Sequence, residues 1–492
     1  MKTKGMTHQV EALQHMAGRD IFALFMEQGT GKTWTLLADA ERLYAAGKID
    51  AVLVIAPKGV HTNWVNREIP THVDAHVIAR AWRSGGGVRA RAHIEELMKP
   101  RDVGETVPLR VLSMNIDAVM TKDGYEFARR FLSATKALFI IDESSRIKNP
   151  DAGRTQKLLR LRGLAKMARI ATGTPINNAP VDVFSQMEFL ESGLLGTTSY
   201  RAFVAEYADL MSAHHPMMQN MIRSNPRAAH AQIVARNPDG SPRWRNLDKL
   251  QRLLAPHSFR VLKRDCLDLP EKIYKVHPFE LTAEQNKAYA MMRDDLRMED
   301  EFGDVVVVKD LAALMKLQQI TSGFVNPPGG GTPIYIGEKN PRLAALTDLM
   351  QDVVGQTIVW ARFREELSSV AAALRKEGLR VVEYHGGVKT ADREAAVDAF
   401  QRGEVDAFVG QPQSGGIGLT LTNAGTVIYY SNDFNRETRS QSEDRAHRIG
   451  TRSNVVYIDL TATGTIDESI ARSLQRKGDL AANVLGDSRG EA

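Results

Sequence analysis

Short apolar runs recur along the chain and alternate with polar stretches that have a helical period. The runs are rich in Val, Ile and aromatic residues, and most end at a polar, Gly or Pro position, which is typical of buried strands followed by turns. These runs are "AVLVIAP", "VLSMN", "ALFIID", "ARIATGTP", "TIVWAR", "RVVEYHG", "DAFVGQP", "TVIYYS" and "VVYIDL". Helix patterns such as "REELSSVAAALRKEG", which ends at Gly378, lie between several of them.

Alternation of strands and helices predicts parallel sheets covered by helices on both faces. The alternation occurs twice, before about residue 190 and after about residue 357, so we expect an α/β protein with two lobes. The predicted parts are a first lobe over 1–190, a helical and basic insertion with linker over 191–265, and a second lobe over 266–485 that contains a helical insertion at 281–341.

Composition narrows the class of protein. A chain of 492 residues is too long for one core. Cys266 is the only cysteine, so internal disulfides and a Cys-rich zinc site are excluded. No apolar run approaches the length of about 20 residues that crosses a bilayer, and the first residues lack the apolar core of a signal peptide. We therefore expect a cytoplasmic protein with no membrane partner.

The 64 basic and 59 acidic residues give a charge of +5, which is compatible with a nucleic-acid partner.

A candidate phosphate loop lies in "IFALFMEQGTGKTWTLL", where an apolar run leads through "GTGKT" into a helix pattern. Glycines let backbone N–H groups face a phosphate, and the start of the following helix favours negative charge. The loop residues are Gly29, Thr30, Gly31, Lys32 and Thr33, with Lys32 placed for the β- and γ-phosphates of ATP and Thr33 for Mg²⁺. The strict pattern has a further glycine five places before Gly31, where this chain has Met26.

A second candidate motif, "LFIIDESSRIKN", places Asp142 and Glu143 at the end of an apolar strand. A phosphate loop requires a carboxylate on another strand end for the metal ion, and Asp142 meets that requirement. Glu143 is then placed to take the proton of the attacking water. Either motif alone can be a structural turn, whereas the two together predict an ATP site that uses Mg²⁺.

Besides these two motifs, the chain contains further sequence blocks. In chain order they are "THQVEAL", "LVIAPKGVHTNWVNRE", "ATGTPINNAPVDVFSQMEFL", "FRVLKRDCLDLPEK", "IVWARFREEL", "YHGGV", "SGGIGLTLTNAGTVIYYSNDFN" and "QSEDRAHRIG". With these blocks the sequence resembles, over nearly its whole length, the SWI/SNF-type ATPases, the double-stranded-DNA translocases of helicase superfamily two. The resemblance implies two tandem RecA-like lobes. It also implies that Gln9 reads adenine and that Gly418 and Gln441 face the nucleotide.

In "QSEDRAHRIG", Arg445 and Arg448 are three residues apart, hence on one face if the segment is helical. Arginines from a second lobe can stabilise the charge of the transferring phosphoryl group, so we expect both to be catalytic. The alternative is a solvated helix of mixed charge.

The resemblance also implies nucleic-acid contacts. The candidates are Lys58, Ser113, Asn115, Thr174, Arg362, His385 and Gly386. Each has a structural alternative; Lys58, for example, can be a solvated residue at a helix start, and His385 a turn residue whose ring is satisfied locally. Trp64 is expected to pack in the core. The Arg- and His-rich segment 212–247 is either a surface insertion or a second duplex contact.

Some positions depart from the family pattern. Ser145 stands where His is usual, Pro412 and Gln413 replace a Thr/Ser–Arg pair, and Thr420 replaces an Asn found in many remodellers.

We expect a monomeric, bare motor of the compact bacterial or phage type, which hydrolyses ATP with Mg²⁺ and moves along duplex DNA, forked or branched DNA included. The alternatives are a strand-separating helicase and a catalytically silent, nucleotide-gated clamp.

Overall fold

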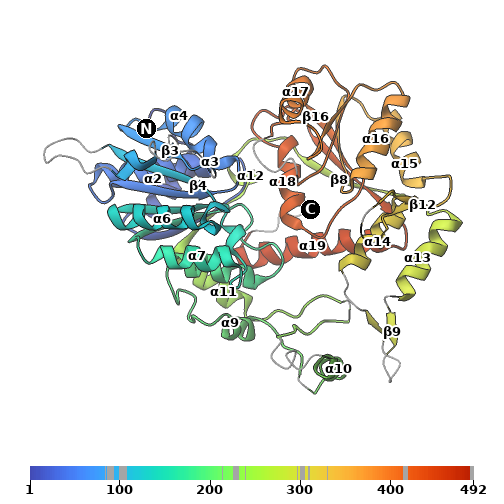
Figure 1. The fold of residues 1–492 in the computed structure, drawn as a ribbon, viewed down its shortest axis with the longest axis horizontal. Helices are drawn as coiled ribbons and strands as arrows, with labels where there is room; N and C mark the ends of the chain where they lie inside the picture. The colour runs from blue at the N-terminus through green and yellow to red at the C-terminus, as the bar shows by residue number, and fades with distance from the viewer. Residues whose placement is uncertain are drawn as a thin grey trace. The chain divides into compact units, whose positions relative to one another are not determined.

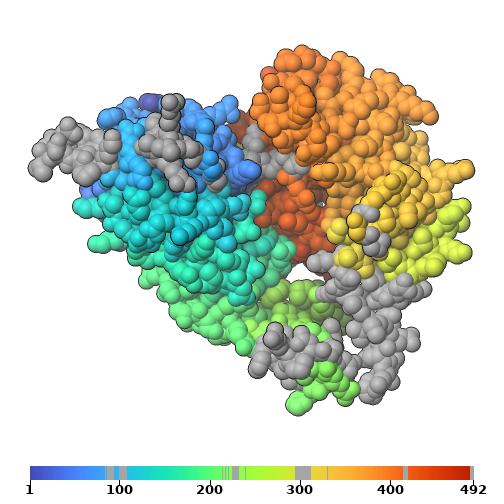
Figure 2. Space-filling view, in the orientation of Figure 1, coloured from blue at the N-terminus to red at the C-terminus, as the bar shows by residue number. Residues whose placement is uncertain are grey.

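The computed structural model describes residues 1–83, 85, 94–98, 108–212, 214–224, 232–238, 240–295, 297–299, 305–307, 311–327, 329, 331–413 and 419–487; the others are grey in Figure 2. The chain forms two compact units, which Figure 1 shows as ribbons. Unit 1 is Met1–Leu267 with Asp479–Ala492, and unit 2 is Asp268–Gly478. The predicted boundaries at 190 and 265 stay predictions.

Unit 1 is built on a seven-stranded sheet in the order β3-β4-β2-β5-β6-β1-β7, and all of its pairings are parallel. Its strands are β1 (Ile21–Met26), β2 (Ala51–Ala56), β3 (Val77–Ala81), β4 (Leu109–Asn115), β5 (Ala137–Asp142), β6 (Met167–Ala171) and β7 (Ser258–Val261). Strands β2 and β5 are buried along their whole length, as expected for a parallel sheet that is covered on both faces.

Helices cover both faces of this sheet (Figure 1). The α-helices of unit 1 are α1 (Thr7–Met16), α2 (Lys32–Ala45), α3 (Val60–Asn63), α4 (Ile69–His72), α6 (Lys122–Ala134), α7 (Gly153–Arg162), α8 (Phe184–Leu190), α9 (Tyr200–Tyr207), α10 (Pro216–Ser224), α11 (Leu247–Leu254) and α12 (Lys263–Cys266). A π-helix, η1 (Trp64–Glu68), joins α3 to α4, and short 3₁₀ helices are η2 (Glu96–Met98), η3 (Ala118–Met120), η4 (Ser144–Ile147), η5 (Pro180–Val183) and η7 (Ala255–His257).

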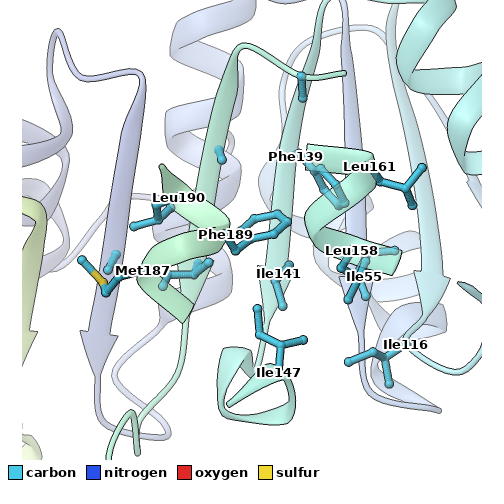
Figure 3. Packing of buried hydrophobic residues seen from close by; sticks show 14 of the residues in the cluster. Ile55, Ile116, Phe139, Ile141, Ile147, Leu158, Leu161, Met187, Phe189 and Leu190 are labelled. Atoms are coloured by element: carbon cyan, nitrogen blue, oxygen red, sulfur yellow. The ribbon is translucent and has the colours of Figure 1, made fainter. Parts of the chain in front are cut away.

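Figure 3 shows the core on one face of the sheet, where side chains of β5 meet those of α7 and α8. The rings of Phe139 and Phe189 pack edge to face with centroids 4.9 Å apart, an arrangement that aromatic pairs favour. Ile141 and Leu158 are fully buried in the same cluster. This packing fixes β5 against two helices just before its carboxyl end.

Unit 2 has a parallel six-stranded sheet in the order β14-β15-β13-β16-β17-β8. Its strands are β8 (Lys272–Phe279), β13 (Gln356–Trp360), β14 (Val381–Tyr384), β15 (Ala407–Gly410), β16 (Ala424–Tyr429) and β17 (Val455–Ala462). Two small antiparallel pairs are β9 (Arg297–Glu299) with β10 (Val305–Val307) and β11 (Phe324–Val325) with β12 (Ile334–Tyr335). Its helices are α13 (Ala283–Asp295), α14 (Leu311–Thr321), α15 (Pro341–Asp352), α16 (Arg364–Lys376), α17 (Thr390–Gln401) and α18 (Arg436–Ala446). The last helix, α19 (Ile466–Leu485), begins in unit 2 and belongs to unit 1 from Asp479 onward.

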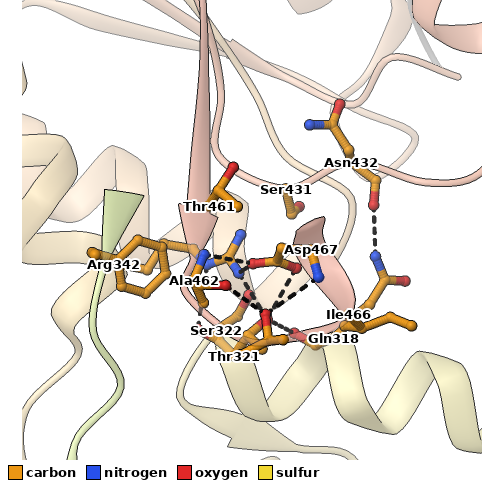
Figure 4. A network of polar contacts seen from close by, with 12 residues as sticks. Gln318, Thr321, Ser322, Arg342, Ser431, Asn432, Thr461, Ala462, Ile466 and Asp467 are labelled. Atoms are coloured by element: carbon orange, nitrogen blue, oxygen red, sulfur yellow. Dashed lines mark hydrogen bonds and ion pairs between the residues drawn. The ribbon is translucent and has the colours of Figure 1, made fainter. Parts of the chain in front are cut away.

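A buried polar network ties three helices of unit 2 together (Figure 4). Arg342 on α15 has 1% of its surface exposed, forms an ion pair with Asp467 on α19, and donates hydrogen bonds to the hydroxyl of Thr321 on α14 and to the carbonyl of Tyr430. A buried guanidinium is tolerated only when it is paired and hydrogen-bonded, and Arg342 meets both conditions.

The predicted fold class, two α/β lobes with parallel sheets, is confirmed. Some strands differ from the prediction. Segment 191–265 was expected to be helical or irregular, yet β7 lies in it and pairs with β1. The insertion 281–341 was expected to be helical and also contains β9 to β12, and neither β3 nor β8 was among the predicted runs. The run "SFRV" is too short for its pattern to be recognised in sequence. In the described part of the chain, no helix has the length and apolar character that would carry it across a membrane.

Candidate nucleotide site

Three neighbouring strands of unit 1, β1, β6 and β5, end at the same edge of the sheet. The loop 27–31 follows β1, Thr172 follows β6, and Asp142 is the last residue of β5. Parallel sheets bind ligands at the carboxyl ends of their strands. The sheet order therefore brings the predicted phosphate loop and the predicted carboxylates, which are far apart in sequence, to one place.

The loop after β1 requires two glycines. Gly29 and Gly31 both have φ of +87°, in the left-handed region that glycine tolerates best. A Cβ atom at Gly31 would also lie 1.9 Å from Nε2 of Gln9, so a side chain there would collide with Gln9. The amide of Gln9 is buried and accepts a hydrogen bond from the backbone N–H of Met6 at 2.8 Å. Gln9 therefore packs directly on the loop.

Lys32 opens helix α2 and has 8% of its surface exposed. Its Nζ donates hydrogen bonds to the carbonyls of Met26 at 3.1 Å and Glu27 at 3.3 Å, which holds the amine across the loop. Met26 stands where the strict phosphate-loop pattern has glycine. The hydrogen bond from Lys32 uses only the backbone carbonyl of Met26, so it does not depend on the side chain at this position. Thr30 is buried and donates to the carbonyl of Glu27, while Thr33 is partly exposed in the first turn of α2.

Asp142 and Glu143 follow the buried strand β5, and their environments differ. Asp142 has 6% of its surface exposed, and its Oδ2 accepts a hydrogen bond from the indole N–H of Trp64 at 2.9 Å. Burial, followed by the charge of Glu143, raises the pKa of Asp142 to about 6, while the bond from Trp64 and the charge of Lys32 act in the opposite direction. A carboxylate that is costly to bury without a countercharge suits a cation-binding position.

Glu143 has a left-handed backbone, with φ of 59° and ψ of 61°. Among the described residues, Asn246 is the only other non-glycine residue with positive φ. Such strain is concentrated at functional sites because the surrounding structure must maintain it. The hydroxyl of Thr172 donates to Oε2 of Glu143 at 3.1 Å, and the backbone N–H of Thr174 donates to Thr172 at 3.2 Å. The carboxylate of Glu143 is thus oriented from the neighbouring strand end.

These residues fit a Mg²⁺ ion bound together with a nucleotide. No cluster of three or more His, Cys, Asp or Glu side chains that could hold a metal occurs in the described ranges. Mg²⁺ does not need one, because it commonly uses one or two protein oxygens and completes its shell with phosphate oxygens and water. Thr33 and Asp142 carry oxygens of this kind, and their role as metal ligands stays a prediction.

Sequence reasoning missed the residues that connect these motifs. The buried hydroxyl of Ser144 donates to Oε1 of Gln186 on α8 at 2.7 Å, and Nε2 of Gln186 donates to the carbonyl of Pro175. Ser145, which stands where His is usual, is buried as well. Ser144 and Thr172 are the hydroxyl donors of the links to Gln186 and Glu143. Gln186 carried no signal in sequence, because an amide inside a helix pattern is common.

In unit 2, helix α18 carries Gln441 and Arg445 but not Arg448. The helix ends at Ala446 because His447 is non-helical, with φ of −109° and ψ of 89°. The shared helical face was expected only if the segment is helical as far as Arg448, and this condition is not met. Arg445 has 3% of its surface exposed, and Nη1 of Arg448 donates to the hydroxyl of Thr420 at 3.1 Å. Gly418 lies outside the described residues.

A buried cluster around Glu443 fixes α18 on the sheet of unit 2. Lys272 and Tyr274 of β8 reach Oε2 of Glu443 at 3.1 and 2.8 Å, and Arg439 reaches Oε1 at 2.8 Å. The hydroxyl of Tyr457 donates to the carbonyl of Glu443. Burial alone would raise the pKa of Glu443, but the charges of Lys272 and Arg439 outweigh it and lower the pKa to about 2. The strand β8 thus sets the position of the helix that carries Arg445.

The residues predicted to contact nucleic acid differ in how far they are exposed to solvent. Lys58 and Gly386 are exposed, and Thr174 and Arg362 are partly exposed. Ser113 has no exposed surface, which corrects its assignment as a direct phosphate contact: its place inside β4 keeps the hydroxyl away from solvent.

The remaining two candidates have local partners. Asn115 accepts a hydrogen bond from the N–H of Ala118, and Nδ1 of His385 accepts one from Gly387 at 3.1 Å. The ring of His385 is thus satisfied locally, as the structural alternative proposed. Their roles in binding nucleic acid stay predictions.

In the segment 212–247, part of the positive charge is neutralised within unit 1. Arg243 and Arg245 both form ion pairs with Asp209, at 3.3 and 3.5 Å. Arg223 and Arg236 are exposed. These two arginines are therefore the better candidates for an external partner.

Family comparisons agree with this architecture. A family model described as "SNF2-related domain" matches residues 8–323, and one described as "Helicase conserved C-terminal domain" matches residues 340–450. YwqA of Bacillus subtilis (strain 168) is 26% identical over 479 residues, 93% of this chain and 46% of that protein. The Danio rerio protein named "Chromodomain-helicase-DNA-binding protein 1-like" is 26% identical over 484 residues, 94% of this chain and 42% of that protein. The chain thus spans less than half the length of these relatives.

Among solved structures, the Sulfolobus solfataricus SWI2/SNF2 ATPase core in complex with dsDNA aligns with 99% of this chain and 94% of that chain, at a TM-score of 0.40 and 21% identity. The family assignment rests on the sequence models. Since the SNF2-related model alone covers well over half of the residues, the resemblance to SWI/SNF-type ATPases is confirmed, and the chain belongs to the SNF2-related family.

Proposed function

We propose that this chain is an ATP-dependent motor that moves along double-stranded DNA and remodels protein–DNA or branched DNA structures. The observation that carries the proposal is the meeting of Lys32, Asp142 and Glu143 at one edge of the unit 1 sheet. Family membership supports it, and so do the printed names of the relatives, which describe helicases.

Each residue of the site has a defined task in ATP hydrolysis. The N–H groups of the loop 27–31 and the amine of Lys32 would bind the phosphates, and Thr33 with Asp142 would hold Mg²⁺. The metal ion, when bound, neutralises charge on the phosphate oxygens. Glu143 would accept the proton of the attacking water, with its carboxylate oriented by Thr172. Arg445 and Arg448 would stabilise the charge that develops on the transferring group.

Hydrolysis assays with different nucleic acids test the proposal. ATP turnover is measured without nucleic acid and with single strands, duplex and forked DNA, and the Lys32→Ala variant gives the background. We expect Mg²⁺-dependent turnover that duplex DNA stimulates and that Lys32→Ala abolishes. No turnover under any of these conditions would leave the nucleotide-gated clamp as the better reading.

Movement without strand separation is tested by two substrates. A motor that tracks duplex DNA displaces a triplex-forming third strand in an ATP-dependent way and leaves a blunt partial duplex paired. Efficient unwinding of a tailed duplex without triplex displacement would replace the translocase by the strand-separating helicase.

A further inference from the structure

The indole of Trp64 lies between the core of unit 1 and the candidate metal site. Trp64 has 1% of its surface exposed and belongs to the apolar cluster that covers one face of the sheet. Its ring nitrogen, at the same time, donates to Oδ2 of Asp142 at 2.9 Å, although 78 positions separate the two residues. The side chain that was expected only to pack therefore also makes a polar contact with a functional carboxylate.

The backbone around Trp64 is unusual. Trp64 is the first residue of the five-residue π-helix η1, which interrupts an otherwise α-helical run between Val60 and His72. Single turns of π-helix inside α-helices are rare and occur frequently at functional sites. The irregular turn thus coincides with the residue that reaches Asp142.

Trp64 has apolar neighbours and one directional polar contact. It lines a cavity of about 10 Å³ together with Ile140, Leu37, Ile69 and other apolar residues. Apolar packing is non-directional. The hydrogen bond to Asp142 is the directional contact of the side chain.

The carboxylate of Asp142 is correspondingly held in place. The indole N–H occupies Oδ2, and the backbone N–H of Glu143 also donates to the carboxylate. Neutral donors of this kind orient a metal-binding group without adding a competing charge. Residues that orient metal ligands in this way typically change metal affinity or activity by about 10–100-fold when they are replaced.

We propose that Trp64 is a positioning residue, which holds the carboxylate of Asp142 through its indole N–H in the orientation that binds the divalent cation of the nucleotide complex. This inference rests on the proposed ATPase function, since it assigns Trp64 to the metal carboxylate of the same site. Phe at this position would preserve an aromatic ring in the core but would lack the donor.

The test measures binding of Mn²⁺ as a probe for the cation, by electron paramagnetic resonance, to the protein with ADP. We expect Trp64→Phe to weaken Mn²⁺ binding about tenfold, while metal-free ADP binds as in the unmodified protein. The matched control is Trp360→Phe, because Trp360 is fully buried in unit 2 and its ring nitrogen has no hydrogen-bond partner among the described residues. Equal Mn²⁺ affinity in Trp64→Phe and the unmodified protein would overturn the proposal.

A double-variant cycle separates positioning from general loss of stability. If Trp64 acts through the carboxylate, Trp64→Phe has no further effect on Mn²⁺ binding once Asp142→Asn is present. Additive losses would identify a purely structural role.

A measurement on the indole groups covers the case in which Trp64→Phe does not fold. With ¹⁵N-labelled tryptophan, the N–H signal that shifts in Asp142→Asn should be the one that Mn²⁺ with ADP broadens most in the unmodified protein. If no indole signal responds to Asp142→Asn, the proposal is wrong. If the unmodified protein hydrolyses no ATP yet shows these metal effects, the failure lies with the proposed function instead.

Discussion

Among single residues, Glu143 combines a strained backbone with a hydrogen bond from Thr172. Because Gln keeps the size and the polar oxygen but cannot take a proton, Glu143→Gln should lower turnover by about 10²–10⁴-fold and leave ATP binding intact. Single-turnover hydrolysis and titration with a fluorescent nucleotide measure the two effects separately. Turnover at the unmodified rate would remove Glu143 from the role of general base.

Gly31 lies in the nucleotide loop, where Gln9 packs against it. Gly31→Ala would strain a backbone with φ of +87° and place a Cβ atom 1.9 Å from Nε2 of Gln9. Gly47, with φ of +67°, has no atom within 4 Å of its Cβ position, so Gly47→Ala has the backbone strain without the collision. We expect both variants to lose about 1–2 kcal/mol of stability, because a Cβ atom disfavours the left-handed region, and only Gly31→Ala to lose affinity for ADP. Isothermal titration gives the affinities, and equal values in both variants would contradict the packing of Gln9 on the loop.

Among helices and strands, the local pattern predicted most of the fold and of the nucleotide loop. The strands β1 and β5 were recognised because each contains a continuous apolar run; β1 ends at Met26, just before the loop that leads to Lys32, and β5 ends at Asp142. The contacts of the site were not recognised. Trp64 reaches Asp142 over 78 positions and Lys272 reaches Glu443 over 171, and no local period records such pairs. The end of α18 before Arg448 was missed for another reason, because the stop comes from the backbone of His447 and not from Gly or Pro.

The attachment of α18 to the sheet gives a pH-dependent prediction. Glu443 has a folded-state pKa of about 2, below its ordinary value of 4.5, so its charge stabilises the fold above pH 4.5 and this contribution is lost as the pH falls toward 2. Glu443→Gln should therefore lower the unfolding free energy of unit 2 by about 3 kcal/mol at pH 7, and the difference should shrink below pH 4.5. Urea unfolding at several pH values measures it.

The matched control is Glu404→Gln. Glu404 pairs with Arg402, but both side chains are more than half exposed, and such surface pairs contribute little. An equal loss of stability in both variants would contradict the structural role of the Glu443 cluster.

For the whole molecule, the last residues of the chain belong to unit 1. Ala481 and Val484 lie in its core with 2% and 0% exposure, and Asp487 forms a two-bond ion pair with Arg260 at 2.8 Å. Arg260 also donates to the carbonyls of Phe25 and Gly173, beside the nucleotide loop. No local pattern predicts this contact, because 227 positions separate Arg260 from Asp487.

Deletion of residues 479–492 should therefore destabilise unit 1 and not unit 2. Exposing the pocket of Val484 and breaking the ion pair should cost about 3–5 kcal/mol, so the thermal transition of unit 1 should move to lower temperature in calorimetry. Val484→Ala should give part of the shift, and Val354→Ala, at a position that is 91% exposed, should give none. An unchanged transition after the deletion would mean that the C-terminal segment does not stabilise unit 1.

Basic side chains of the segment 212–247 are candidates for contacts with the phosphates of duplex DNA. A protein that binds phosphates releases counterions, so log affinity should fall with log salt by about 0.9 for each phosphate contact. Arg223 and Arg236 are exposed, whereas Arg243 and Arg245 share the countercharge of Asp209. If the segment 212–247 contacts the duplex, Arg223→Ala with Arg236→Ala should flatten the slope by up to about 1.8, and Arg243→Ala with Arg245→Ala should flatten it less. Fluorescence anisotropy of a random-sequence duplex, titrated between low and physiological salt, gives the slopes. Identical slopes in all three proteins would show that the segment is a surface insertion and that duplex binding depends on other residues of the two units.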